Sequence, residues 1–207
     1  MKTFSITKLE IARNNPNEFA KSLKVVNQTG SFFGRSQFIR WQDAVNEFNK
    51  TNDLANALEY LEKSFSNYAN TSKNRKSYES YIVSLYAYVT ALKRKGIFFL
   101  KKESIKLFLN SKSMITGRVP LSYMNSGGGF SLYFFSKVSS DWAKELRFPI
   151  IQNYFSEEVY GIELDKITVG IFSIQDNKFY EHSFNETEIK EAKKELKRIS
   201  RVIFNAL

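Results

Sequence analysis

Residues 113–161 read SMITGRVPLSYMNSGGGFSLYFFSKVSSDWAKELRFPIIQNYFSEEVYG, and they hold the clearest succession of secondary-structure signals in the chain. Residues 114–124 are rich in β-branched and large apolar side chains, residues 125–129 form a turn cluster with three consecutive glycines, and residues 130–138 are again apolar. This pattern predicts a β-hairpin. The polar residues 139–141 then offer helix-start chemistry, and apolar residues recur at helical spacing to the end of the segment.

Both faces of this hairpin are apolar. Phe130, Leu132 and Phe134 point to one side of the second strand by the two-residue period, whereas Tyr133 and Phe135 point to the other. A strand that is apolar on both faces is typical of a sheet that is covered on both sides.

The remaining elements extend this unit into a mixed sheet. Strand patterns mark residues 97–109, 165–174 and 178–183, and Asn185 opens a last helix with acidic residues in its first turn and basic residues further along. Before residue 97 the patterns are helical, beginning at Thr3, apart from a predicted loop and a polar, basic linker. The predicted fold is α/β (α+β), with a mixed central sheet flanked by helices.

One domain of 207 residues is expected, divided into a helical part over residues 1–96 and a sheet-containing part over residues 97–207. The predicted loop covers residues 25–34, the predicted linker covers residues 70–76, and Gly96 is expected to stop the helix before the first long strand.

Composition excludes several classes of site. The chain has no cysteine and a single histidine, His182, so a thiolate or multi-histidine metal centre is not expected. No metal and no cofactor are predicted. No apolar run reaches the length of a membrane helix or resembles a signal peptide, which predicts a cytoplasmic protein without a membrane partner.

The charge balance favours a polyanionic partner. The formal net charge is +10 and the isoelectric point is about 9.6, which is typical of proteins that neutralise phosphates. Lys- and Asn-rich proteins without such a partner have the same composition, so a solvated basic surface is the alternative. The basic clusters proposed to contact nucleic acid are Lys73, Arg75, Lys76, Lys93, Arg94 and Lys95.

Four tyrosines lie between these two basic clusters. Tyr78, Tyr81, Tyr86 and Tyr88 could form a stacking platform for single-stranded nucleic acid. The alternative, which we favour from the sequence, is that the helix buries a broad stripe containing Tyr78 and Tyr81.

The order of elements resembles the PD-(D/E)XK, or restriction-endonuclease-like, superfamily, whose core is αβββαβα. The similarity is greatest to the nuclease domains of recombination helicases and CRISPR-adaptation nucleases. It is carried by GRVPL at residues 117–121, FFSK at residues 134–137 and IIQNY at residues 150–154, behind an N-terminal segment with a short Ser-containing start, a helix and a proline. The resemblance covers about the last 110 residues by element order and implies a nuclease-like fold.

The sequence departs from the family where the family holds its divalent cation. Pro120 stands at the position of the strand aspartate and Phe135 at that of the second carboxylate, and only Lys137 is retained. Neither proline nor phenylalanine offers the oxygen ligands that Mg²⁺ requires. The resemblance therefore implies a degenerate nuclease centre with no catalytic and no metal-binding residues.

Three functions follow from this interpretation. The first is a catalytically inactive, nucleic-acid-binding accessory subunit of a bacterial DNA-processing or phage-defence complex, with DNA as the expected ligand. The second is a protein-interaction adaptor within a larger complex. The third is a metal-dependent nuclease whose carboxylates have moved to Glu103, Asp141 or Glu145. For the first, Arg118, Lys137, Arg147 and Gln152 complete the set of predicted nucleic-acid contacts.

Overall fold

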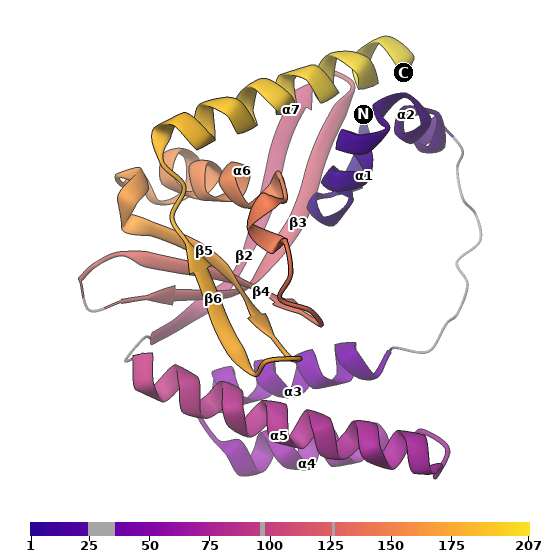
Figure 1. Ribbon diagram of the computed structural model, residues 1–207, viewed down its shortest axis with the longest axis vertical. Coiled ribbons are helices and arrows are strands. Elements are labelled where there is room, and N and C mark those ends of the chain that lie inside the picture. Colours follow the sequence, from indigo (N-terminus) through magenta and orange to yellow (C-terminus); the bar gives the residue numbers. More distant parts are fainter. Residues whose placement is uncertain (25–35, 96–97, 126) are drawn as a thin grey trace.

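The computed structural model describes residues 1–24, 36–95, 98–125 and 127–207 (Figure 1). The predicted loop over residues 25–34 and the predicted helix stop at Gly96 lie outside these residues. In chain order the elements are β1 (Lys2–Ser5), η1 (Ile6–Lys8), α1 (Leu9–Asn14), α2 (Pro16–Lys24), α3 (Gln37–Thr51), α4 (Leu54–Phe65), α5 (Ser72–Lys95), β2 (Phe98–Asn110), β3 (Ser113–Met124), β4 (Phe130–Ser136), η2 (Trp142–Lys144), α6 (Arg147–Tyr154), η3 (Phe155–Tyr160), η4 (Leu164–Lys166), β5 (Ile167–Ser173), β6 (Lys178–His182) and α7 (Glu186–Ala206).

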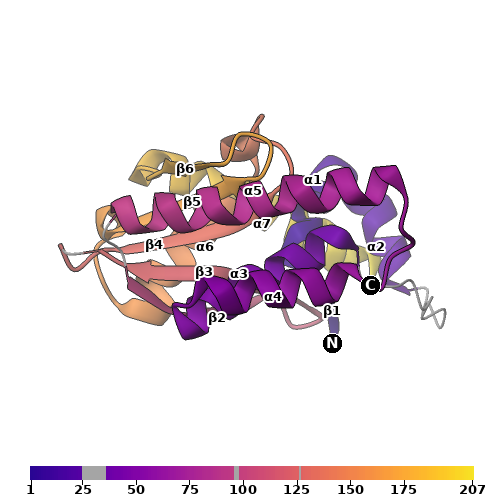
Figure 2. The ribbon, with the colours of Figure 1, turned by 90° about the horizontal axis from the view of Figure 1, so that it is seen from below.

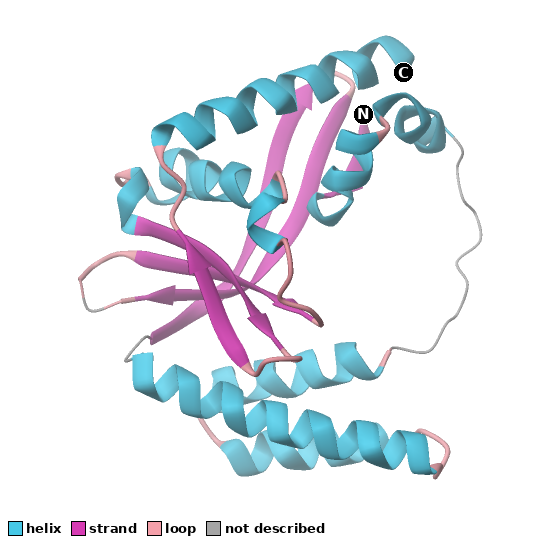
Figure 3. Cartoon of the chain, viewed as in Figure 1, coloured by secondary structure: helices cyan, strands magenta, loops and turns pink. Residues whose placement is uncertain are grey.

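The fold is mixed α/β, as the sequence predicts, and the described residues form one six-stranded sheet that is flanked by helices on both faces (Figure 3). The strand order is β1-β3-β4-β5-β6, and β2 pairs with the opposite edge of β3. β2, β4 and β6 run antiparallel to their partners β3, β3 and β5, whereas β4 and β5 are parallel. The order βββαββα over the C-terminal half is confirmed.

β1 is a strand that the sequence did not predict. It pairs in parallel with the start of β3, in the register Lys2 with Ser113 through Ser5 with Thr116. Gly117 comes directly after this pairing, and a Cβ atom there would lie 2.6 Å from the side chain of Ile6. The glycine therefore allows the N-terminal segment to pack closely against β3. The prediction of a helix beginning at Thr3 was wrong for these residues.

A β-bulge at Pro120 changes which face of the sheet the side chains of β3 point to. Lys101 pairs with Ser122 and Glu103 pairs with Val119, so two steps along β2 oppose three steps along β3. Proline lacks a backbone N–H and is tolerated at such bulges. Because of the extra residue, Val119 belongs to the hydrophobic cluster on one face of the sheet and Leu121 to the cluster on the other.

Each face of the sheet has its own hydrophobic cluster. The first packs β1, α1 and α2 with α6, α7 and one face of the sheet, and the second packs α3, α4 and α5 on the opposite face (Figure 1). Leu132 and Phe134 lie in the first cluster and Tyr133 in the second, with Phe135 packed against it, as their alternation predicts. The predicted helical part over residues 1–96 is thus shared between both layers.

Helix α5 begins earlier than predicted. Residues 72–76, interpreted as part of a polar linker, form its first turn, and the hydroxyl of Thr71 accepts a hydrogen bond from the backbone N–H of Asn74 (3.2 Å). Figure 2 shows α5 running alongside α4 across the sheet. Two lysines assigned to a linker, Lys73 and Lys76, therefore lie on a regular helix.

The helix predicted after the hairpin begins later. Asp141 is not a helix cap: its φ is +57° and its side chain makes no capping hydrogen bond. A short 3-10 turn at Trp142–Lys144 precedes α6, and a π-helical turn follows it. The last helix is as predicted, since Asn185 and Glu188 form a reciprocal capping box. No helix in the described residues is both long and apolar enough to cross a membrane.

Candidate nucleic-acid interface

A groove of about 980 Å³ lies between the first half of α5, the end of β4 and the turn that joins β5 to β6. On α5, Lys73, Lys76 and Ser80 share one face because they are separated by three or four residues. Lys137 comes from the segment directly after β4. The lining residues are Ser72, Lys73, Lys76, Ser77, Ser80, Tyr81, Val83, Lys137, Ile174, Gln175 and Asn177.

The groove is positively charged. Lys73, Lys76 and Lys137 are all exposed, and none makes an ion pair with any residue the structure describes. No carboxylate is found among the described residues that line it. The Nζ atom of Lys137 lies 5.4 Å from the centroid of the Phe38 ring, a cation–π contact that orients the amine. Three unpaired ammonium groups in one groove are suited to an anion with several charges.

Polar groups surround the lysines. Hydroxyls of Ser72, Ser77 and Ser80 and the amide of Gln175 lie in the same groove, and such groups commonly donate hydrogen bonds to phosphate oxygens. The side-chain oxygen of Asn177 is buried and has no hydrogen-bond partner within the described structure. The groove thus combines positive charge with neutral hydrogen-bond donors. The residues of the β5–β6 turn were missed by sequence reasoning, because nothing in their local pattern brings them to α5.

The other basic cluster of α5 is separate from this groove. Lys76 and Lys93 are about 25 Å apart along the helix axis. Lys95 is ion-paired with Glu181 and lies 5.7 Å from the ring centroid of Phe179, so its charge is used within the fold. Lys93 and Arg94 are exposed. The predicted set on α5 therefore divides into two sites at opposite ends of the helix.

Arg118 belongs to a third basic group. It is exposed on β3, and its charge acts on Lys102 of the neighbouring strand. Burial lowers the pKa of Lys102, Asp43 opposes this, and the charges of Lys50 and Arg118 lower the pKa further. Arg118 is accessible, but it is not among the residues that line the groove.

Arg147 has a structural role and is not a free contact. Its guanidinium group lies 4.7 Å from the Phe148 ring centroid and 5.2 Å from that of Phe134, and its Nε atom lies 2.6 Å from a carboxylate oxygen of Glu145. Burial raises the pKa of Glu145, and the pairing with Arg147 opposes this rise. The prediction that Arg147 contacts nucleic acid is corrected, because both its planar face and its charge are already engaged.

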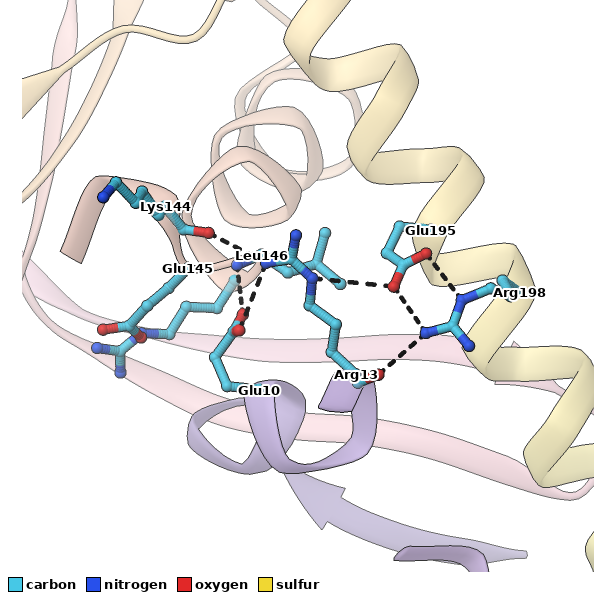
Figure 4. A network of polar contacts seen from close by, with 8 residues as sticks. Glu10, Arg13, Lys144, Glu145, Leu146, Glu195 and Arg198 are labelled. Carbon is cyan, nitrogen blue, oxygen red and sulfur yellow. Dashed lines mark hydrogen bonds and ion pairs between the residues drawn. The ribbon is translucent and has the colours of Figure 1, made fainter. Parts of the chain in front are cut away.

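The surroundings of Glu145 form a polar network between three helices (Figure 4). Glu10 of α1 accepts a hydrogen bond from the backbone N–H of Leu146, and Arg13 donates to the carbonyl of Lys144 (3.1 Å). Arg198 of α7 donates to the carbonyl of Arg13 (2.9 Å) and pairs with Glu195. These contacts fix α1 against α7 and against the segment that precedes α6, on the face of the sheet opposite to α5.

Gln152 is buried, and its amide is used entirely within the fold. Its nitrogen donates to the carbonyls of Leu164 (3.1 Å) and Phe184 (3.0 Å), and its oxygen accepts from the backbone N–H of Phe184 (2.8 Å). The prediction of a nucleic-acid contact is corrected here too, since the side chain joins α6 to the segment that enters α7.

Phe135, which the sequence resemblance aligns with a metal ligand of the nucleases, lies in aromatic packing. Phe135 lies in edge-to-face contact with Trp41 of α3, with ring centroids 5.1 Å apart, and 6.4 Å from the ring of Tyr88. Pro120 is at the bulge of β3. Among the residues the structure describes, no group of three or more histidine, aspartate or glutamate side chains could hold a metal ion. Of the three motif positions, Lys137 alone reaches the basic groove.

The four tyrosines of α5 do not form a common platform. Tyr88 is fully buried and shares a hydroxyl hydrogen bond with Tyr123, while Tyr78 and Tyr81 are half-buried against Phe65. Tyr86 is exposed. The preferred interpretation of the sequence, a core-facing stripe, agrees with the packing of Tyr78 and Tyr81 against the second cluster, and Tyr88, which was not assigned to that stripe, is buried as well.

Comparisons with known proteins give no family. No family model matches the sequence, and no curated protein matches it. Among solved structures, the protein described as "Crystal structure of SSO0001" is similar to this chain with a TM-score of 0.31 and 13% sequence identity. The match covers 92% of this chain and 85% of that one.

Proposed function

We propose that this protein is a nucleic-acid-binding accessory protein of nuclease-like topology without nuclease activity, and that it binds the phosphate backbone in the groove of Lys73, Lys76 and Lys137. The observation that carries this proposal is a groove that brings two lysines of α5 together with Lys137, which lies more than 60 residues further along the chain. None of the three makes an ion pair with a described residue, and no described carboxylate lines the groove. The resemblance of the sequence to nucleases supports a role for such a protein in a prokaryotic DNA-processing or phage-defence complex.

The lysines are suited to holding the phosphate backbone and not to recognising the base sequence. Lysine amines are flexible point charges that contact phosphate oxygens, whereas base recognition uses planar or bidentate groups. We expect binding that depends little on sequence and strongly on salt, because each neutralised phosphate releases counterions.

The test compares the triple variant Lys73→Ala, Lys76→Ala, Lys137→Ala with wild type by fluorescence anisotropy on labelled DNA. If all three lysines neutralise phosphates, wild-type affinity falls by a factor of about 40 between about 50 and about 200 mM salt from these contacts alone. In the triple variant the slope of log affinity against log salt becomes shallower by about 3.

A matched control removes the same charge elsewhere. Lys2, Lys8 and Lys166 are exposed lysines outside the groove, and their triple replacement by alanine lowers the net charge equally. We expect this control to retain nearly all of the wild-type affinity. Equal losses in the two triple variants would show that net charge, and not the groove, determines binding, and absence of binding at the lower salt concentration would refute the proposal.

A further inference from the structure

A second, smaller pocket lies at the turn between α4 and α5. It has a volume of about 360 Å³, within the range of sites for small organic groups. Three aromatic residues dominate it: Phe65 is buried, and the ring centroids of Tyr68 and Tyr78 lie 5.4 Å and 5.3 Å from that of Phe65. The rings are tilted with respect to Phe65, at 50° and 43°, so they form an angled wall and not a closed stack.

Polar groups lie at the pocket beside the rings. Glu62 and Arg75 are both among its lining residues, and Arg75 is held by a hydrogen bond to the side-chain oxygen of Asn70 (3.2 Å). Glu62 and Tyr78 line the same pocket, and burial and then the charge of Glu62 raise the pKa of Tyr78. A carboxylate accepts hydrogen bonds from the exocyclic amino groups of bases, and an aromatic wall offers them a stacking surface.

The pocket and the lysine groove lie on two flanks of the same helical turns. Lys73 and Lys76 face the groove, whereas Asn74, Arg75 and Tyr78 face the pocket. A helix with its side chains is about 10 Å across, so the two sites are separated by the width of α5. One nucleotide chain passing over the start of α5 can therefore contact both sites at once.

We propose that this pocket binds one unstacked base of a single-stranded nucleic acid whose phosphates contact the lysine groove. This inference rests on the proposed function and adds the class of ligand to it. A base inside a duplex is stacked on both sides and paired at its edge, so it is not available to such a pocket. Single strands are therefore bound more tightly than duplexes of the same length.

The test replaces Tyr78 by leucine, which keeps apolar volume but removes the flat ring, and uses three probes: a single-stranded oligonucleotide, the same backbone with abasic positions, and heparin. Loss of one stacked base lowers the affinity for the intact oligonucleotide by a factor of about 5 to 150. Affinities for the abasic strand and for heparin stay at the wild-type level, because their contacts are to charge alone.

Two further variants make the result specific. Tyr78→Phe keeps the ring and is expected to restore binding of the intact strand to near the wild-type affinity. Tyr86→Leu removes an exposed tyrosine on the same helix outside the pocket, and it is expected to change nothing. Circular dichroism melting of each variant shows that the fold is intact.

The outcomes separate the two proposals. If wild type binds the intact and abasic strands equally, the base pocket is overturned while the lysine groove stands. An equal loss for all three probes in Tyr78→Leu also overturns it, since the residue would then only support the helix. If wild type binds neither heparin nor the abasic strand at low salt, the groove proposal fails by itself.

Discussion

The ring of Phe135 contacts the indole of Trp41 edge to face, with an interplanar angle of 80° and ring centroids 5.1 Å apart. Phe135 is on a strand of the sheet and Trp41 is on α3, in the layer that covers this face. The contact therefore links the sheet to the helical layer that covers this face. An edge-to-face pair of this kind stabilises the packing between the sheet and the helical layer.

Trp41→Ala is expected to lower the free energy of unfolding by about 3–5 kcal/mol, because it leaves a large cavity in the second hydrophobic cluster. Trp41 is fully buried and also stacks on Phe172, with ring centroids 5.8 Å apart. Urea unfolding followed by circular dichroism measures the change. Val83→Ala, at an exposed position of α5, is the control. If Trp41→Ala lowers the free energy of unfolding by less than about 1 kcal/mol, this face of the sheet is not tightly packed.

Phe135→Asp is expected to destabilise the protein by about 3 kcal/mol or more, because it places a carboxylate among aromatic rings. It is not expected to create cleavage, since Pro120 provides no second ligand. Plasmid nicking with Mg²⁺ or Mn²⁺, with and without EDTA, checks both wild type and variant. Val138→Asp at an exposed neighbouring position controls for the added charge, and EDTA-sensitive nicking by the wild type would disprove the proposed lack of nuclease activity.

Gln152→Leu is expected to cost about 2–4 kcal/mol of stability, because it leaves backbone groups of Phe184 and Leu164 buried without partners. DNA affinity of the folded variant should be unchanged. Gln175→Leu, at an exposed position in the groove, should show the opposite pattern of unchanged stability and weaker binding. Denaturant unfolding and anisotropy are measured on both, and reduced binding without reduced stability in Gln152→Leu would restore it as a contact residue.

Alkaline pH is expected to unfold the protein cooperatively. Burial raises the pKa values of Tyr88 and Tyr123 above the ordinary value of about 10. Above that pH the unfolded chain loses these protons while the folded chain retains them, so stability is complete below about pH 10 and falls as pH rises. Urea midpoints measured between about pH 8 and about pH 11.5 test this. Replacing exposed Tyr86 by phenylalanine should leave the profile unchanged, and a flat wild-type profile would contradict the burial of these phenols.

Local patterns predicted most of the elements of this fold but not its long-range pairings. The hairpin strands, the paired strands β5 and β6 and the capping box at Asn185 depend on neighbouring residues, so the sequence predicts them directly. β1 has four residues, and its partner lies more than 100 residues away. The first turn of α5 was interpreted as a linker because its residues are polar, although Thr71 supports its start.

The sequence predicted which types of residue form the candidate site, but it did not predict which of them lie together. Lys73 and Lys76 were selected for their charge and Lys137 for its place in the nuclease-like motif, and only the folded chain shows that they share a groove. Arg147 and Gln152 have the same polar character in sequence, but their partners at Phe148 and Phe184 engage them internally. A sequence pattern cannot distinguish a polar residue that is exposed to solvent from one that hydrogen-bonds to a buried carbonyl.

The pairing of β1 with β3 also affects how the chain is made. During synthesis at about 5–20 residues per second, β1 emerges about 5–20 seconds before the strand that it pairs with. Its backbone groups must stay solvated or be shielded by a chaperone for that time. β1 pairs only with the first residues of β3, and β4 pairs with its last residues. A C-terminal truncation before residue 113 therefore removes the partner of β1 and leaves the N-terminal helices without the strands that they pack against.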